Sequence, residues 1–468
     1  MLSKENNDLL TRTGPDTPMG RLMRCFWTPA MTEAEVPAAD EAPVRLQLLG
    51  EALVVFRDTE GRVGVLDQHC PHRGASLFFG RNEEGGVRCV YHGWKFGVDG
   101  ECLDMPTEAS DSPMRCKVRA RAYPARIAGG VLWVYMGDPD KMPPLPDFEW
   151  LGLPSSHVYV SRWEQDCNYA QAMEGELDSA HVGFLHSLVD KTHDDDRALT
   201  GRFFKNDKAP LWKIVPTPSG FLACNGRRVD ESQRYWRVNQ FLLPFYTMIP
   251  PHPAEARLVR MWVPMNDERC WVLCATFRPD RPLEEKELTA WRNGDYAHRR
   301  VIPGTTRPTE RLDNDYLIDR QQQKTVSFTG IAGIRAQDAM VSESAGPIVD
   351  RTREHLGSSD RAVVAMRRSL MEAARACVDG QRPAGPDHPY LYGVRATPDG
   401  SARKPRPDRV RRAHGHRASQ GSASRLGLSR LQTTAAQEAT TPRCPALHAK
   451  HQETHDEIPP MPDPARER

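Results

Sequence analysis

Two short segments decide the fold of this chain: Cys70-Pro-His72-Arg-Gly and Cys89-Val-Tyr-His92-Gly-Trp, with sixteen residues between His72 and Cys89. Each segment offers one thiolate and one imidazole, in the spacing C-x-H and then C-x2-H. Short apolar runs separated by turn residues surround both segments, so we expect hairpins to hold the two loops side by side. Two sulfur and two nitrogen donors on paired loops are suited to a compact metal site.

Two kinds of metal centre could use this donor set. A tetrahedral zinc ion takes two cysteines and two histidines, and so does an iron–sulfur cluster with mixed ligands. Zinc sites usually group their ligands as Cys-Cys and His-His pairs, whereas each loop here offers one of each kind. That arrangement favours a [2Fe–2S] cluster whose two irons carry different ligands. With Cys70, His72, Cys89 and His92 as ligands, this region resembles the Rieske proteins, whose two-loop signature it matches in full.

Composition excludes several classes of function. The chain has 468 residues with 63 basic and 62 acidic side chains, which gives no reason to expect nucleic acid or a membrane as a partner. No apolar run approaches the roughly 18 residues of a membrane span, and the N-terminus is charged where a secretory signal is apolar. The eleven cysteines lack the pattern of a secreted disulfide framework. We therefore expect a cytoplasmic protein.

Composition and periodicity divide the chain into four parts. Residues 1–40 are expected to form an N-terminal helical segment, and residues 41–145 a small all-β domain with hairpin turns. Residues 151–395 combine helical spacing with successive strand candidates, which predicts a larger α+β domain with helices on an antiparallel β-sheet. Residues 396–468 lack aromatic side chains and are rich in Arg, Ser and Pro, so we expect a disordered basic tail.

A second group of polar residues has the spacing D-x2-H-x4-H, with Asp178, His181 and His186. The lack of proline over residues 166–186 predicts a helix, on which the aspartate and the first histidine share a face. The two histidines would then lie about 140° apart around the helix axis. They can bind one metal only if the helix ends, bends or widens, and Gly183 makes such a distortion cheap. The alternative is an amphipathic helix with two partly buried histidines.

Together, the two groups resemble the large subunit of the Rieske non-haem iron oxygenases, over about residues 1 to 395. In that family, D-x2-H-x4-H follows the Rieske domain and supplies the histidines of a mononuclear iron(II) site. The resemblance implies that His181 and His186 are two ligands of a 2-His-1-carboxylate triad. Asp338 in Arg335-Ala-Gln-Asp338 matches the family's third ligand best. The other candidates for this carboxylate are Glu343, Asp350 and Glu354.

The resemblance gives Asp178 a catalytic role that is not metal ligation. The family's aspartate at this point links a ligand histidine, here His181, to a Rieske histidine of a neighbouring subunit, here His92. A carboxylate that accepts an imidazole N–H orients the ligand and couples the two sites. A homotrimer, or stacked trimers, would thus be part of catalysis. Glu174 and Glu176 flank the site, and either could support it.

The family implies an oxygenase that uses dioxygen and receives electrons through the Rieske cluster. The chain has no G-x-G-x-x-G nucleotide motif after a strand, so the electrons must come from another protein. The resemblance implies a reductase partner with a flavin and a plant-type [2Fe–2S] cluster, which takes its electrons from NADH.

The substrate is expected to be a small aromatic acid. Asn7-Asp-Leu-Leu-Thr-Arg-Thr-Gly-Pro and Thr17-Pro-Met-Gly resemble the phthalate dioxygenase group, which implies dihydroxylation of a phenoxybenzoate, benzoate or phthalate type of ring. Among these, a monocarboxylate is preferred. A carboxylate needs a cationic anchor, ideally an arginine. The candidates are Arg227, Arg228, Arg234 and Arg237, in the strand region that we expect to form the floor of the pocket. We favour Arg237, and Ser179 beside the bridging aspartate could also face the substrate.

Two other functions remain open at this stage. The family also contains monooxygenases and O-demethylases of aromatic acids, and the residues above do not separate them from dioxygenases. A function of another class is a Rieske electron-transfer protein without oxygenase activity, which would need no second metal site.

Overall fold

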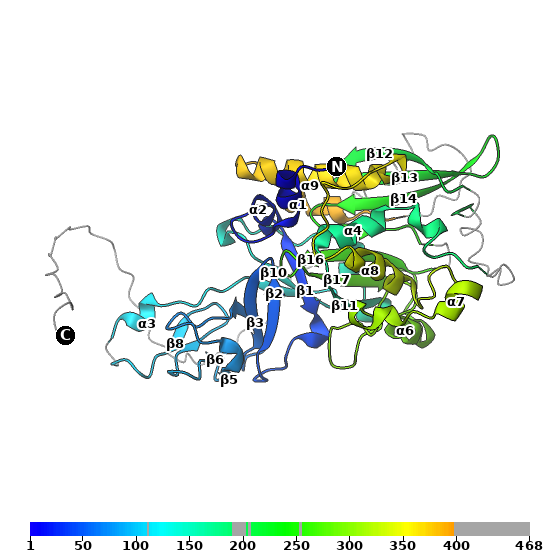
Figure 1. The fold of residues 1–468 in the computed structure, drawn as a ribbon. Helices are drawn as coiled ribbons and strands as arrows, with labels where there is room; N and C mark the ends of the chain where they lie inside the picture. The colour runs from blue at the N-terminus through cyan, green and yellow to red at the C-terminus, as the bar shows by residue number, and fades with distance from the viewer. Residues whose placement is uncertain (110–111, 190–202, 205–206, 252–254, 397–468) are drawn as a thin grey trace, which may run out of the picture. The chain divides into compact units, whose positions relative to one another are not determined.

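The described part of the chain is built on one seven-stranded and three smaller antiparallel sheets (Figure 1). The residues described in this computed structural model are 1–109, 112–189, 203–204, 207–251 and 255–396. The tail expected over 396–468 lies outside these residues, apart from its first member. The predicted α+β class, with a small all-β part and helices on an antiparallel sheet, is confirmed.

The expected N-terminal helical segment is helical only in its first part. Helices α1 (Lys4–Thr11) and α2 (Pro18–Arg24) each begin after a hydroxyl residue whose side chain accepts a backbone N–H. Strand β1 (Trp27–Thr32) follows, because its aromatic, β-branched and proline residues favour an extended chain over a helix. It pairs with β10 (Val131–Tyr135), which also pairs with β9 (Ala125–Ala128).

Two further small sheets carry the segments with the C-x-H and C-x2-H spacings. The first sheet consists of β2 (Val44–Leu48), β3 (Glu51–Arg57) and β4 (Val63–Asp67). The second consists of β5 (Arg81–Glu83), β6 (Gly86–Arg88), β7 (Lys95–Phe96) and β8 (Cys102–Asp104). The C-x-H segment follows β4, and the C-x2-H segment connects β6 to β7. The C-x2-H loop therefore closes the β6–β7 hairpin, whereas the C-x-H loop leaves the end of the β3–β4 hairpin and leads to the second sheet.

The seven-stranded sheet is the scaffold of the larger part. Its strands, in spatial order, are β11 (Val158–Gln165), β17 (Cys270–Phe277), β16 (Arg257–Pro264), β15 (Tyr246–Met248), β14 (Arg234–Leu242), β13 (Gly220–Arg228) and β12 (Leu211–Thr217). Neighbouring strands are antiparallel throughout. Every residue of β17 is buried, as expected of a strand covered on both faces.

Three helices of the larger part position the second polar group. Helix α4 (Tyr169–Leu177) contacts strands β14 to β16 of the sheet, and it also contacts α8 (Ile334–Ser344) and α9 (Arg361–Val378) (Figure 1). Seven of the nine residues of α4 are buried, so its orientation is strongly constrained. Besides α1 and α2, the remaining α-helices with bounds in the described part of the chain are α3 (Met114–Lys117), α6 (Glu285–Arg292), α7 (Arg320–Thr325) and α10 (Ala384–Asp387). Among the described residues, no helix combines the length and apolar character of a membrane span.

The prediction of a single helix over residues 166–186 is wrong. Helix α4 ends at Leu177, and Asp178 is extended, with φ −76° and ψ 117°. Its Oδ1 accepts a hydrogen bond from the backbone N–H of Ala180, at 2.7 Å. Such local bonds from aspartate compete with the helical ladder. A 3-10 turn, η6 (His181–Gly183), follows, so the two histidines need no distorted helix to meet.

Candidate metal centres

The two loops of the first site fold in the same way. The backbone N–H of Cys70 donates to the carbonyl of Ala75 at 2.8 Å, and that of Cys89 donates to the carbonyl of Trp94 at 2.9 Å. Each loop also contains a glycine in the left-handed region, which side-chain-bearing residues rarely adopt. These glycines are Gly74, with φ +75°, and Gly93, with φ +77°. Two similar turns thus present their cysteines and histidines toward each other.

The four side chains suit a metal cluster. Cys70 and Cys89 are each 2% exposed, and the rings of His72 and His92 have centroids 4.4 Å apart. Nδ1 of His92 is buried without a hydrogen-bond partner among the described residues, as expected of a nitrogen that binds a metal. Burial raises the pKa of the Cys70 thiol to about 11, so a metal must compensate its thiolate at neutral pH.

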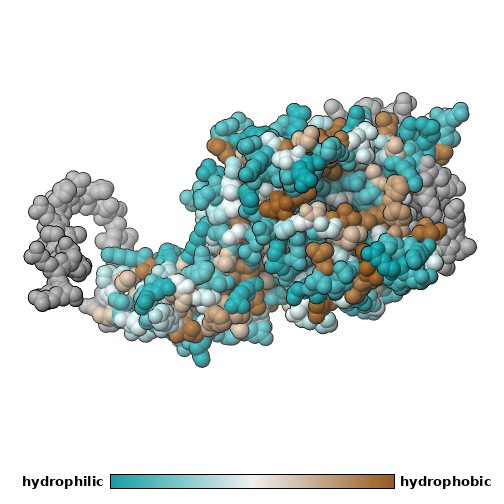
Figure 2. Space-filling model, viewed as in Figure 1, coloured by the Kyte–Doolittle hydropathy of each residue, from teal (hydrophilic) through white to brown (hydrophobic). Residues whose placement is uncertain are grey.

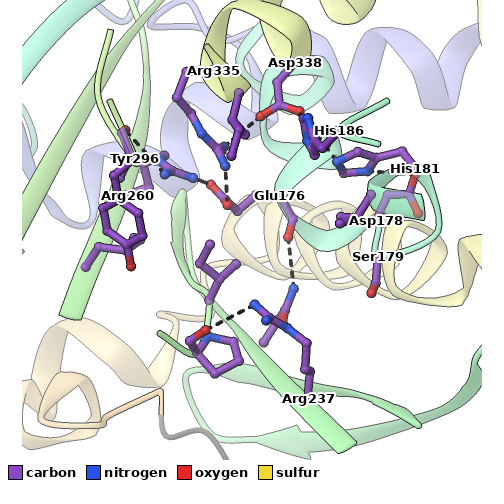
Figure 3. Close-up of a pocket in the computed structure, with 18 of the residues that line it drawn as sticks. Glu176, Asp178, Ser179, His181, His186, Arg237, Arg260, Tyr296, Arg335 and Asp338 are labelled. Carbon is purple, nitrogen blue, oxygen red and sulfur yellow. Dashed lines mark hydrogen bonds and ion pairs between the residues drawn. The ribbon is translucent and has the colours of Figure 1, made fainter. Parts of the chain in front are cut away.

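The second site brings together residues from three places in the chain. His181 lies in η6, His186 follows it in a loop, and Asp338 lies on α8. Oδ1 of Asp338 lies 3.1 Å from Nε2 of His186 and 3.5 Å from Nε2 of His181 (Figure 3). One ligand atom from each residue lies within 4.8 Å of the others, so the three can hold one metal ion.

Hydrogen bonds at the other ring nitrogens orient both imidazoles. Nδ1 of His181 lies 3.3 Å from Oδ2 of Asp178, and Nδ1 of His186 lies 2.7 Å from Oε1 of Gln337. Because these oxygens only accept hydrogen bonds, each Nδ1 carries the proton and each Nε2 offers its lone pair to a metal. Gln337 is itself fixed, since its Nε2 donates to the carbonyl of Ile331 at 2.8 Å. Sequence reasoning missed Gln337, although it directly precedes Asp338.

The charges of the second site favour a bound cation. Burial alone would raise the pKa of Asp338, but Arg335, His186 and His181 outweigh it and hold that pKa well below its usual range. Burial would lower the pKa of His181, but Asp178 and Asp338 outweigh it and raise that pKa. The site is therefore built around ionised carboxylates that favour a proton or a metal ion at His181.

The other carboxylates considered for the third ligand are engaged elsewhere. Glu343 accepts a hydrogen bond from Tyr316, Asp350 accepts one from Thr352, and Glu354 pairs with Arg367. The flanking residue Glu174 pairs with Arg351 and Arg367. Glu176, by contrast, contacts Arg260 and lies 3.6 Å from Arg335 beside Asp338.

A cavity of about 620 Å³ adjoins the second site (Figure 3). His181, His186 and Asp338 line one side of it, and apolar residues such as Ile249 and Leu258 line another. A cavity of this size and character accommodates a small aromatic molecule.

The two residues expected to contact the substrate both line this cavity, but they differ in their bonding. The hydroxyl of Ser179 donates to Oδ1 of Asn225 and accepts from Arg227, each at 3.0 Å. Arg237 on β14 donates to the carbonyl of Pro250 at 3.1 Å and forms no ion pair with any described residue. Of the four candidate arginines Arg227, Arg228, Arg234 and Arg237, it alone lines the cavity. Its positive charge is therefore available to a ligand.

Comparison with known proteins identifies the families of two regions of the chain. Residues 26–124 match the Rieske [2Fe-2S] domain family, and residues 134–395, more than half of the chain, match the family described as LigXa C-terminal domain like. The structure is also similar to that of dicamba monooxygenase bound to dicamba, with a TM-score of 0.54 and 18% identity over 76% of this chain and 98% of that one.

Three curated relatives are similar over most of their length. The 3-chlorobenzoate-3,4-dioxygenase oxygenase subunit of Comamonas testosteroni is 40% identical, over 84% of this chain and 93% of its own. The phthalate 4,5-dioxygenase oxygenase subunit of Pseudomonas putida is 39% identical, over 82% and 89%. The 5,5'-dehydrodivanillate O-demethylase oxygenase subunit of Sphingobium sp. is 31% identical, over 82% and 83%.

The chain therefore belongs to the Rieske non-haem iron oxygenases, as an aromatic ring-hydroxylating oxygenase subunit. It is an enzyme that uses a Rieske [2Fe–2S] cluster and a mononuclear iron, with electrons that come from NADH through a separate reductase.

Proposed function

We propose that this chain hydroxylates the ring of an aromatic carboxylate of the benzoate type with dioxygen, at an iron held by His181, His186 and Asp338. One observation carries this proposal: the three ligands converge on a cavity that also presents the unpaired guanidinium of Arg237. The Rieske cluster is held by Cys70, His72, Cys89 and His92. A Rieske electron carrier would need no such second site, so we disfavour that function.

An iron(II) ion held by His181, His186 and Asp338 would supply the activation of dioxygen, with electrons from the Rieske cluster. The chain's own residues prepare this chemistry. Asp178 and Gln337 hold the two imidazoles in the orientation and protonation state that a metal requires. The cavity's apolar walls limit water beside the ring to be hydroxylated.

Arg237 is the proposed anchor of the substrate carboxylate. Its guanidinium lies at the cavity wall with one backbone partner, so several N–H groups remain to bind a carboxylate in a two-point contact. Ser179 acts differently in this proposal. Its bonds to Asn225 and Arg227 hold the loop after α4, and it shapes the cavity without donating to the substrate.

We further propose that the electrons reach the iron across a contact with a second copy of the chain, within a trimer or stacked trimers. The proposed bridge, Asp178, has a side chain that is 26% exposed, and that of His181 is 21% exposed. Beside the Rieske histidines, Val90 and Tyr91 are 60% and 54% exposed. Exposed apolar side chains next to a redox centre favour a protein contact.

A second cavity supports the same proposal. It has a volume of about 450 Å³, and Asp178, His181, Phe184 and Phe328 all line it. The two phenylalanines are 45% and 52% exposed. Figure 2 shows apolar side chains gathered beside a hollow in the part that contains α4 and α8. A neighbour's Rieske loops would bring His92 to Asp178 here.

The remaining partners follow from the family. The proposed reductase contains a flavin and a plant-type [2Fe–2S] cluster, and the cytoplasm is the proposed location. Residues 41–145 and 151–395 are our proposed limits of the Rieske and catalytic domains. One alternative function is favoured by a specific observation: the relative named as an O-demethylase matches 82% of the chain. Oxygenation of a ring methoxy group is therefore the second candidate.

A substrate screen under ¹⁸O₂ tests the proposal. The oxygenase is reconstituted with an NADH-dependent reductase and offered benzoate, 3-chlorobenzoate, phthalate, phenoxybenzoate and a methoxybenzoate. We expect a cis-diol with two labelled oxygen atoms from a benzoate-type acid. Release of formaldehyde from the methoxy acid alone would favour the O-demethylase. Turnover of the neutral analogue toluene at the rate of the acids would contradict a carboxylate anchor.

A further inference from the structure

A row of alternating charges extends from Asp338 into the protein. Oδ2 of Asp338 lies 2.9 Å from Nη1 of Arg335, and the same nitrogen lies 3.6 Å from Oε1 of Glu176. The second oxygen of Glu176 is in contact with Nη1 of Arg260 (Figure 3). The row combines side chains from α8, α4 and β16, so it joins two helices and the sheet at the metal site.

The two oxygens of Asp338 have different surroundings. Oδ1 faces Nε2 of both histidines, whereas Oδ2 faces Arg335. The contact of Oδ2 is an ion pair without the alignment of a hydrogen bond, since this buried atom has no hydrogen-bond partner among the described residues. Electrostatic attraction to Arg335 is therefore what turns Oδ2 away from the point where the imidazoles meet.

Burial keeps Arg335 in this position. The side chains of Arg335, Glu176 and Arg260 are 14%, 2% and 0% exposed. Leaving a buried charge without a partner is strongly destabilising. Glu176 is a single anion between two guanidinium groups, so Arg335 depends on Asp338 as its second carboxylate. Movement of Arg335 out of the row would leave two carboxylates, Asp338 and Glu176, with Arg260 as the single cation of the row.

Arg335 also differs from the proposed substrate anchor, Arg237, in its carboxylate partners. Arg335 and Arg260 line the same cavity as Arg237. Arg260 is in contact with Glu176, and Arg335 lies 3.6 Å from it. Arg237 has no carboxylate partner among the described residues. An incoming carboxylate therefore meets an unpaired cation at Arg237, whereas Arg335 remains with Asp338.

We propose that Arg335 is a positioning residue that makes Asp338 a one-oxygen ligand, an inference that rests on the proposed iron site. A carboxylate can give a metal one or both of its oxygens. If Asp338 gave both, it would occupy two positions and leave fewer for dioxygen beside the substrate. Arg335 holds Oδ2 back and so preserves an open position.

The test compares iron affinity and ligand access in Arg335→Met. Chelator-treated oxygenase that retains its Rieske cluster is titrated with Fe(II), and nitric oxide is then added as a probe of open positions. The Fe(II)–nitrosyl signal is read by electron paramagnetic resonance with the cluster oxidised and silent. In this variant, Glu176 keeps Arg260 as its partner, and Asp338 still lies beside the imidazoles of His181 and His186.

We expect Arg335→Met to bind Fe(II) about tenfold more tightly, a typical size for changes around a metal ligand. The tighter binding follows because Oδ2 is released to the metal and a repelling cation is removed. The nitrosyl signal should weaken or change its rhombicity. Arg335→Lys keeps the charge and should retain the wild-type affinity and signal. Arg234→Met removes an arginine outside the cavity lining and should change neither.

Weaker Fe(II) binding in Arg335→Met, with an unchanged nitrosyl signal in the iron that remains, would overturn the inference, because Arg335 would then merely stabilise the site. Arg335→Gln provides the same neutral comparison if the methionine variant does not fold. Failure of the wild-type protein to bind Fe(II) would instead contradict the proposed iron site itself. Asp338→Ala is expected to lose Fe(II) binding and serves as the reference for a protein without an iron site.

Discussion

The two metal sites of this chain are built in opposite ways. All four proposed Rieske ligands lie in the segment from Cys70 to His92, on two loops with the same pattern of backbone hydrogen bonds. The proposed iron ligands span His181 to Asp338 and depend on a 3-10 turn, a loop and helix α8. The first site is thus a local structure, whereas the second exists only when distant elements pack together.

This difference also determines how each site is supported. The Rieske loops present their ligands through backbone turns, for which glycines with positive φ are required. The proposed iron site also depends on side-chain contacts between residues that are distant in sequence, such as Gln337 with His186 and Arg335 with Glu176. A metal site of the second kind is sensitive to more single substitutions, and those substitutions can be far from it in sequence.

The largest expected effect is the loss of one site without the other. His186→Ala should abolish turnover and mononuclear iron while the visible Rieske spectrum persists, because the first site is local. Cys89→Ala should remove that spectrum and also abolish turnover. Iron analysis and absorption spectroscopy measure both outcomes. Co-expressed, the two inactive chains should recover part of the activity in mixed oligomers if electrons cross between copies. No recovery would contradict the proposed contact.

The next largest effect concerns the link between the two sites. Asp178→Asn keeps a similar shape but removes the charge that pairs with His181. We expect both centres to remain occupied and turnover to fall about 100-fold or more. A single-turnover experiment with a reduced cluster measures the step directly. Glu174→Gln, which alters a nearby carboxylate in the Arg351 and Arg367 network, is the control for a simple loss of charge.

A smaller effect is expected at the substrate end of the cavity. Arg237→Gln should raise KM for a benzoate-type acid by about 10- to 100-fold, because a charged hydrogen bond contributes roughly 1.5–3 kcal/mol. Steady-state kinetics measure this change, and Arg237→Lys should show part of it. Arg228→Gln, an exposed arginine of the same sheet outside the cavity lining, provides the control. Equal KM values for Arg237→Gln and wild type would exclude the anchor.

Removal of the support for one ligand should have a more moderate effect. Gln337→Leu deprives His186 of its acceptor and should weaken Fe(II) binding about tenfold, with the Rieske spectrum unchanged. Gln337→Glu retains an acceptor and should remain near the wild type. Titration of the chelator-treated protein distinguishes them. If both variants bound iron alike, the hydrogen bond to His186 would have no role in orientation.

The smallest expected effect is that of Ser179→Ala. Its hydroxyl lies between Asn225 and Arg227, so the loss should lower the free energy of unfolding by about 1–3 kcal/mol. KM should change less than about threefold, because Arg237 rather than Ser179 binds the carboxylate in our proposal. Denaturant unfolding and steady-state kinetics separate the two effects. A large rise in KM with unchanged stability would show direct contact with the substrate.

Sequence reasoning predicted the local features of the molecule well. The small all-β part and the larger α+β part with an antiparallel sheet follow from patterns of apolar residues, and the structure agrees with this class. The helix over 166–186 was predicted wrongly, because its spacing does not reveal that Asp178 forms a competing bond with Ala180. Sequence reasoning missed Gln337 and the row from Arg335 to Arg260. These side chains lie on elements that are far apart in the sequence, so no sequence spacing reveals their contacts.

The sequence by itself determined the kind of chemistry, because the spacing of two short motifs matches the signature of a known family, and that resemblance implies two iron sites. Only the tertiary structure decided which carboxylate lies beside His181 and His186 and which arginine of the cavity has no carboxylate partner among the described residues. It also decided that Arg335 pairs with Oδ2 of Asp338 rather than with Oδ1. The physical reason is distance along the chain. Packing of α4 and α8 against the sheet, rather than any local pattern, brings these groups together.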